Sequence, residues 1–107
     1  MLDENKIKQI GQTIVDKIDI RKVILFGSYA YGKPTENSDL DICIVKKNIK
    51  NKIKKKREIR DLLKDIKVSK DILLVDEKYY KTHSDENWIN TALYDAKKYG
   101  RVLYEQK

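Results

Sequence analysis

A Gly-Ser pair and two aspartates, separated by ten residues, are the part of this sequence whose residue types and spacing favour chemistry: Gly27-Ser28, then Asp39-Leu40-Asp41. In an extended strand, residues two apart share a face, so Asp39 and Asp41 project their carboxylates to one side from positions about 6.6 to 6.8 Å apart along the backbone. Mg²⁺ prefers oxygen ligands and shares them with substrate phosphates. The pair therefore predicts a site for Mg²⁺ ions that hold the attacking and leaving oxygens during phosphoryl or nucleotidyl transfer. The alternative is a solvated pair beside a turn, where aspartate is common.

Gly27-Ser28 is the complementary half of this prediction, because it follows a short apolar run and begins a turn. A strand-to-helix turn presents backbone N–H groups and a hydroxyl to a phosphate. Glycine allows the phosphate to approach the backbone closely. A third carboxylate, Asp71, begins a later apolar run. If that strand neighbours the strand of Asp41, Asp71 completes the group as a metal ligand or as the base that accepts the nucleophile's proton.

The elements that must position these residues alternate between helix and strand. Apolar residues at helical spacing predict helices, and short β-branched runs predict strands. Ser84 is the expected N-cap of the last helix, and Gly100 its C′ residue. The expected order is a helix over 7–18, a strand over 23–26, a short helix over 28–31, a strand over 39–45, a helix from about 52 to 66, a strand over 68–75, a helix after Ser84 and a strand over 101–105. This α-β-α-β-α-β-α-β order predicts one small mixed sheet with helices.

Composition sets the class of protein. The chain has 107 residues, of which 40% are hydrophobic and 38% charged, so we expect one globular domain and no membrane span. A formal net charge of +7 favours an anionic partner. The single cysteine, Cys43, cannot form an internal disulfide, and the charged amino-terminal segment lacks the apolar stretch of a secretory signal. We therefore expect a cytoplasmic protein.

The segment from Gly27 to Asp41 resembles the signature of the nucleotidyltransferase superfamily typified by DNA polymerase beta, in particular its minimal nucleotidyltransferases of the MntA antitoxin type. The resemblance extends over nearly the whole chain. A helix precedes the Gly-Ser strand, Asp71 lies on a later strand, and the segment 99–105 is similar to the family's closing glycine and strand. It implies an α+β, polymerase beta palm-like fold in a single nucleotidyltransferase domain, residues 1–107.

The resemblance also implies a function and roles for residues. Gly27 and Ser28 hold the triphosphate of ATP, while Asp39, Asp41 and Asp71 bind two Mg²⁺ ions. A nucleophile attacks the α-phosphate, and pyrophosphate is released. For the antitoxin group, the acceptor is a tyrosine hydroxyl on a HEPN-type ribonuclease toxin, which adenylylation silences. The expected activity is therefore a Mg²⁺-dependent protein adenylyltransferase in a toxin–antitoxin system.

One position departs from the family's pattern. Many members have Ala-Arg-Gly where this chain has Ala30-Tyr31-Gly32, so an arginine that could assist phosphate binding is absent. Lys33 is the expected substitute in nucleotide binding. Since the three carboxylates are intact, we expect an active enzyme.

A basic stretch from Lys46 to Arg57 holds eight basic residues in twelve and no acidic one. It predicts a solvated helix face, a docking surface for an acidic partner or a nucleic-acid surface. It lacks the aromatic residues that stack on single-stranded bases, so a protein partner is the better functional alternative and a nucleic-acid acceptor is not expected.

Five further residues have structural explanations. Cys43 is expected to be a small buried hydrophobe, and Trp88 to anchor the last helix to the sheet. Tyr29 and Tyr31 flank the Gly-Ser turn and either pack there, stack on a base or line the acceptor channel. His83 has no second ligand nearby in sequence, so no catalytic role is expected.

Two other functions stay open. The same chemistry on a small molecule such as an aminoglycoside is one, and a non-catalytic nucleotide-binding or toxin-occluding module is the other. The short chain favours a protein acceptor, since an acceptor held without additional domains must supply its own binding surface.

Overall fold

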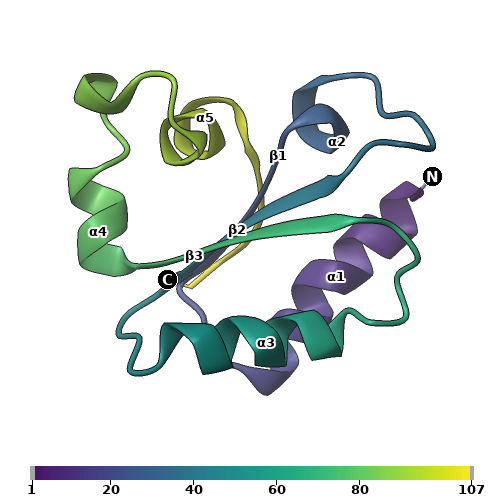
Figure 1. Ribbon diagram of the computed structural model, residues 1–107, viewed down its shortest axis with the longest axis horizontal. Coiled ribbons are helices and arrows are strands. Elements are labelled where there is room, and N and C mark those ends of the chain that lie inside the picture. Colours follow the sequence, from purple (N-terminus) through teal and green to yellow (C-terminus); the bar gives the residue numbers. More distant parts are fainter. Residues whose placement is uncertain (1, 107) are drawn as a thin grey trace.

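The computed structural model describes residues 2–106, and its centre is a four-stranded mixed sheet in the order β3-β2-β1-β4 (Figure 1). β1 is antiparallel to both of its neighbours, β2 and β4, whereas β2 and β3 are parallel. The strands are β1 Lys22–Phe26, β2 Leu40–Lys46, β3 Lys70–Asp76 and β4 Arg101–Glu105. The α+β class and the single mixed sheet predicted from the sequence are confirmed.

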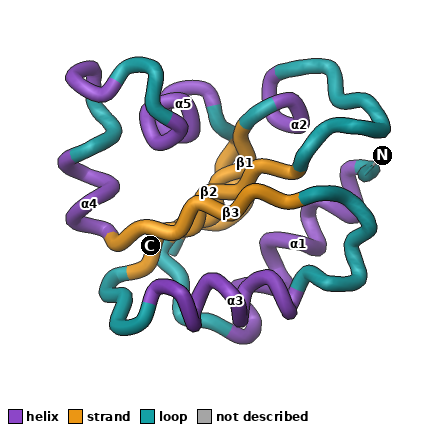
Figure 2. Tube along the Cα trace, in the orientation of Figure 1, coloured by secondary structure: helices purple, strands orange, loops and turns teal. Residues whose placement is uncertain are grey.

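Helices cover both faces of the sheet, as Figure 2 shows by colour. α1 (Glu4–Lys17) and α3 (Lys52–Leu62) lie together on one face, and α4 (Glu77–Thr82) and α5 (Ala92–Tyr99) lie on the other. The short α2 (Ser28–Tyr31) lies at one end of the sheet, and a single 3₁₀ turn, η1 (Glu86–Trp88), separates α4 from α5. Within residues 2–106, no helix is both long and apolar enough to cross a membrane.

The alternation of side chains in β2 determines which face carries the site. Leu40, Ile42 and Ile44 are fully buried in the core beneath α1 and α3. Because successive side chains of a strand point to opposite faces, Asp41 and Cys43 belong to the face of α4 and α5, where Cys43 is buried in the second core. β2 therefore contributes side chains to both cores. Asp41 lies near the start of β2, on the face of the second core.

The region after β3 differs from the prediction. The polar stretch after Asp76 contains an unpredicted helix, α4, whose first turn is capped by the Asp76 carboxylate accepting the Tyr79 N–H at 2.7 Å. Ser84 is not an N-cap, because it is buried and its hydroxyl donates to the Tyr80 carbonyl. The last helix begins eight residues later at Ala92, capped by Thr91.

Trp88 is the second correction in this region. Its side chain is 37% exposed, and the neighbouring Ile89 is 55% exposed, so neither anchors the last helix to the sheet. Leu93 and Ala96 of α5 have that role, since both are buried in the core that contains Ile24 and Phe26. The apolar spacing predicted the contact between helix and sheet correctly and placed the start of the helix too early.

Candidate active site

Gly27 joins β1 to α2 and lies directly against Asp41. Its φ is +73° and its ψ −158°, a backbone conformation that is nearly restricted to glycine. A Cβ atom at this position would overlap the Oδ2 atom of Asp41. Two independent requirements therefore select glycine here, because the turn needs the unusual backbone and the carboxylate needs the space.

The turn that follows is short and well supported. The carbonyl of Gly27 accepts the N–H groups of Ala30 and Tyr31 at 3.0 and 3.2 Å. The first N–H groups of a helix have no hydrogen-bond acceptor within that helix. In α2 these are the N–H groups of Ser28 and Tyr29. Tyr29 is buried, and its hydroxyl accepts the Leu2 N–H at 3.4 Å, which ties the turn to the start of the chain.

The three aspartates occupy neighbouring positions at one end of the sheet. Asp39 directly precedes β2, Asp41 is in β2, and Asp71 is the register partner of Asp41 in the parallel strand β3. Neighbouring strands are about 4.7 to 4.9 Å apart, and register partners point to the same face. On the other side of Asp41, its register partner is Phe26, the residue before Gly27. The structure thus brings Gly27, Asp41 and Asp71 together on three adjacent segments.

The electrostatics of Asp41 show that the carboxylates interact. Its pKa is raised, first by partial burial and then by the negative charges of Asp71 and Asp39. A divalent cation would relieve this repulsion, and the donor set consists of the carboxylate oxygens that Mg²⁺ prefers. Within residues 2–106, no three acidic, histidine or cysteine side chains are gathered closely enough to enclose a metal ion. The three aspartates would supply carboxylate oxygens to an open site, and water and phosphate oxygens would supply the remaining ligands of Mg²⁺.

Tyr31 and Lys33 follow the Gly-Ser turn in the sequence, at the end of α2 and in the loop after it. Lys33 is exposed in the loop between α2 and β2, the position from which it was predicted to contact phosphates. Tyr31 is 53% exposed, and its ring meets that of Tyr99 edge to face, with 6.0 Å between centroids. This pair joins the ends of α2 and α5 and was not predicted, because Tyr99 is distant in sequence.

The other singled-out residues are separate from the carboxylates. Cys43 is fully buried, and burial raises the pKa of its thiol to about 12, as expected of a core residue. His83 stacks on Tyr79 with 3.9 Å between ring centroids, and its Nδ1 is 2.7 Å from the Thr82 hydroxyl. His83 thus has partners within its own helix and turn.

The basic stretch Lys46 to Arg57 lies at the opposite end of β2 from Asp41 and continues into α3. Lys46 donates to the Asp19 carbonyl at 2.7 Å, and Lys55 pairs with Glu58 at 3.0 Å. Burial, followed by the charge of Lys55, lowers the pKa of Lys46. This stretch is therefore a surface separate from the carboxylates.

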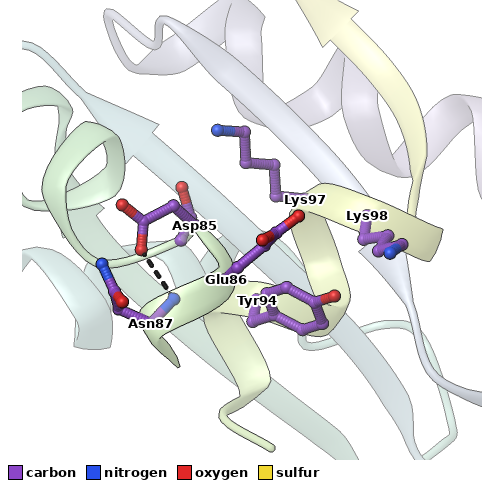
Figure 3. Close-up of a pocket in the computed structure, with 7 residues that line it drawn as sticks. Asp85, Glu86, Asn87, Tyr94, Lys97 and Lys98 are labelled. Atoms are coloured by element: carbon purple, nitrogen blue, oxygen red, sulfur yellow. Dashed lines mark hydrogen bonds between the residues drawn. The ribbon is translucent and has the colours of Figure 1, made fainter. Parts of the chain in front are cut away.

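A hollow of about 550 Å³ lies between η1 and α5, and Asp39, Asp41 and Asp71 do not line it (Figure 3). Acidic and basic side chains both line it, and the Asp85 carboxylate accepts the Asn87 N–H at 3.1 Å. The lining residues are Ser84, Asp85, Glu86, Asn87, Tyr94, Lys97 and Lys98. None of the site residues predicted from the sequence lines this hollow.

Comparison with known proteins identifies the family. In a mixed sheet, a Gly-Ser turn beside aspartates on adjacent strands is one way to hold a nucleotide and its metal ions. Residues 5–107 match the family described as Polymerase beta, Nucleotidyltransferase. The chain belongs to this nucleotidyltransferase family. A candidate protein adenylyltransferase of Methanocaldococcus jannaschii is 39% identical over 75 residues, which cover 70% of this chain and 73% of that protein. Another from the same organism is 33% identical over 69 residues, covering 58% of this chain and 47% of that protein.

Solved structures share the fold. A double Asp-to-Glu variant of the MntA–HpeT toxin–antitoxin superimposes with a TM-score of 0.63 at 22% identity, covering 99% of this chain and 76% of that one. A toxin–antitoxin structure with AMP-PNP gives 0.63 at 23% identity, with the same two coverages of 99% and 76%. The complex of a tri-AMPylated Shewanella oneidensis HEPN toxin with its MNT antitoxin gives 0.59 at 18% identity, covering 94% and 72%.

Proposed function

We propose that this chain transfers AMP from ATP to a tyrosine hydroxyl of a HEPN-type ribonuclease toxin and acts as the antitoxin of that pair. The observation that carries the proposal is the position of Asp41. It has the Gly27-Ser28 turn on one side and its register partner Asp71 on the other. The Gly27-Ser28 turn contacts Asp41, and Asp71 lies beside Asp41 on the neighbouring strand, an arrangement that supports the binding of one nucleotide by all three segments.

In this proposal each group has a separate task. The first N–H groups of α2 and the hydroxyl of Ser28 hold the triphosphate, and Lys33 reaches it from the following loop. Asp39, Asp41 and Asp71 hold two Mg²⁺ ions. When bound, these ions neutralise the charge that develops on the phosphate oxygens.

The transfer itself is a substitution at the α-phosphorus. The tyrosine oxygen forms a bond to this phosphorus, and the bond between the phosphorus and the bridging oxygen of pyrophosphate breaks. The phenolic proton passes to a carboxylate of the site. Asp71 is the candidate for this role, because it is exposed at the amino end of an edge strand, where an incoming protein side chain can reach it.

The relatives support the choice of a protein as acceptor. The Methanocaldococcus jannaschii proteins are candidate protein adenylyltransferases, and one of them matches most of this chain. Among the structures with the same fold, one holds AMP-PNP and another contains an AMPylated HEPN toxin. AMP-PNP and the AMPylated toxin belong to those structures. Because this chain shares their fold, ATP as donor and a HEPN protein as acceptor are the first pair to test.

The test is transfer of label from ATP carrying a radioactive α-phosphate to a HEPN-family protein from the same genome, in the presence of Mg²⁺. We expect the wild-type chain to label the HEPN protein, and Asp41→Asn to reduce labelling by at least about a hundredfold. Asp61→Asn is the matched control, since Asp61 is an exposed aspartate of α3 away from the site. It should label as the wild type does.

Other outcomes select among the remaining functions. If Asp41→Asn neutralises the toxin as well as the wild type does and no label appears, occlusion replaces catalysis as the function. If an aminoglycoside is labelled while the HEPN protein is not, the acceptor is a small molecule. Mass spectrometry of the labelled protein then identifies the residue that carries AMP.

A further inference from the structure

β3 forms an open edge of the sheet, and beyond Asp71 the proposed function gives this edge no role. β3 is a terminal strand of the sheet, and the Leu40 N–H donates to the Ser69 carbonyl at 2.8 Å. Because backbone groups alternate in direction along a strand, residues 71, 73 and 75 face β2 as Ser69 does. The N–H and C=O groups of Lys70, Ile72, Leu74 and Asp76 therefore face away from the sheet.

A hollow shows that the carboxyl half of this edge is accessible. It has a volume of about 300 Å³ and is lined by β3 residues 73–76 together with Ile49, Lys52 and Tyr79. Tyr79 is 46% exposed. The hollow therefore offers apolar walls, an aromatic ring and the carboxylate of Asp76 beside hydrogen-bonding groups of the strand.

The sequence of β3, Lys-Asp-Ile-Leu-Leu-Val-Asp, is complementary to itself when read in the opposite direction. We propose that β3 pairs antiparallel with β3 of a second copy of this chain, with the two-fold axis at Leu73. In this register Lys70 is opposite Asp76 at both ends, and Ile72 is opposite Leu74. These four residues are the ones whose backbone groups face outward, so each opposed pair exchanges two hydrogen bonds. Opposite charges directly across a strand pair are favourable, and like charges are not.

The hollow has a defined occupant in this arrangement. Residues that are directly opposite in an antiparallel pair project to the same face of the sheet. Lys70 of the second copy would therefore exchange its hydrogen bonds to the Ile66 and Val68 carbonyls for the hollow beside Asp76 and Tyr79. The Asp76 carboxylate attracts its ammonium group, and the exposed ring of Tyr79 supplies a favourable face for a cation.

The other edge of the sheet is protected against the same pairing. β4 is also self-complementary in charge, with Arg101 and Glu105 at its ends. Both charges are in ion pairs, since Arg101 pairs with Glu4 at 3.0 Å and Glu105 with Lys22 at 2.8 Å. On β3, the Lys70 ammonium donates to the carbonyls of Ile66 and Val68 at 2.6 and 3.1 Å, and the Asp76 carboxylate accepts the Tyr79 N–H, so both are bonded to neutral backbone groups. The register between β1 and β4 also shifts between Val23 and Ile24, and such irregularities discourage edge-to-edge association. β3 is a regular seven-residue strand.

The pairing would bring the second copy to the carboxylate site. Val75 of the second copy is opposite Asp71 in this register, at a distance typical of directly opposed side chains, about 4.5 to 5.5 Å between Cβ atoms. The dimer would therefore form one wall beside the third carboxylate, and a continuous sheet would link the two sites.

A cysteine at the axis tests the register directly. Leu73→Cys places two thiols in a pair without hydrogen bonds, where the Cα atoms are about 4.5 Å apart, within the range for a disulfide. We expect mild oxidation to convert Leu73→Cys to a covalent dimer. Val102→Cys is the matched control, because Val102 is 50% exposed on β4 and would cross-link only by random collision. The wild type should not cross-link, since Cys43 is buried.

Charge reversal provides a second measurement. Lys70→Glu places a carboxylate opposite Asp76 at both ends of the interface and should raise the dimer dissociation constant, measured by analytical ultracentrifugation, about tenfold. Lys67→Glu, an equal charge change at an exposed loop residue, should leave it unchanged. A wild-type chain that sediments as a monomer at every concentration overturns the proposal. So does a dimer in which Leu73→Cys cross-links no faster than Val102→Cys.

Discussion

Replacing Gly27 with alanine separates two costs that the structure assigns to one position. The first is backbone strain, because φ is +73° and ψ −158° at this residue, a region that costs about 1 to 3 kcal/mol for other residues. The second is the overlap of the new Cβ with Oδ2 of Asp41, since overpacking costs about 1 to 3 kcal/mol. Gly27→Ala should therefore reduce the free energy of unfolding by about 2 to 6 kcal/mol.

A double-mutant cycle distinguishes the two costs. Asp41→Ala removes the carboxylate that the new Cβ would meet and keeps the backbone strain. In that background, Gly27→Ala should cost only about 1 to 3 kcal/mol, and the difference between the two backgrounds measures the steric contact. Urea denaturation followed by circular dichroism gives each value, and thermal unfolding should move by about 4 °C per kcal/mol.

Two results would refute this reasoning. A loss of less than about 0.5 kcal/mol in the wild-type background would mean that the turn tolerates a side chain. An equal loss in both backgrounds would mean that Asp41 can move away at no cost, so that its position is not fixed by the turn. Transfer activity measured on the same variants should fall for Gly27→Ala even at temperatures where the protein is fully folded.

Two further changes test the electrostatics and the packing around the site. The pKa of Asp41 is raised in the fold, so ionisation of this carboxyl reduces the free energy of unfolding. This loss of stability is absent below the pKa of the unfolded state, near 4, and is complete once the pH exceeds the pKa of the folded state. Asp41→Asn should therefore be more stable than the wild type at pH 7 and equally stable near pH 3, and equal stability at both pH values would contradict the cause given for the shift. Tyr29 is 7% exposed and Tyr31 is 53% exposed. Tyr29→Ala should cost about 3 to 5 kcal/mol of unfolding free energy, while Tyr31→Ala should cost about 0.5 to 1.5 kcal/mol, the value of its ring contact with Tyr99; similar losses at both positions would contradict the assigned burial.

The fold was largely predictable where the sequence pattern is repetitive. Alternation in the strand of Asp41 and helical spacing from Ile7 to Ile14 gave elements that the structure confirms. The region around α4 was not predictable in this way. That helix has six residues and buries one side chain, Tyr80, so no period of buried residues marks it. Ser84 has the residue type of a cap, but its hydroxyl bonds backward to α4 instead.

The positions of the site residues depend on topology as well as on spacing. Asp39 and Asp41 share a strand end because they are two residues apart, which the sequence alone gives. The register between Asp41 and Asp71 depends on the parallel pairing of β2 and β3 across α3, and no spacing rule determines it. The ring pair of Tyr31 and Tyr99 is similar, because it exists only once α2 and α5 are packed at the same end of the sheet.

The position of Asp71 on the edge strand also affects how the site responds to local opening. β1 lies between two strands, whereas β3 is held to the sheet by β2 alone. In the monomer, backbone amides of β3 should therefore exchange with solvent through smaller openings than those of β1, at a free-energy cost below that of global unfolding. Each such opening removes the third carboxylate while the turn and Asp41 stay in place. The fraction of molecules competent for transfer should accordingly decrease on heating before the fold itself is lost.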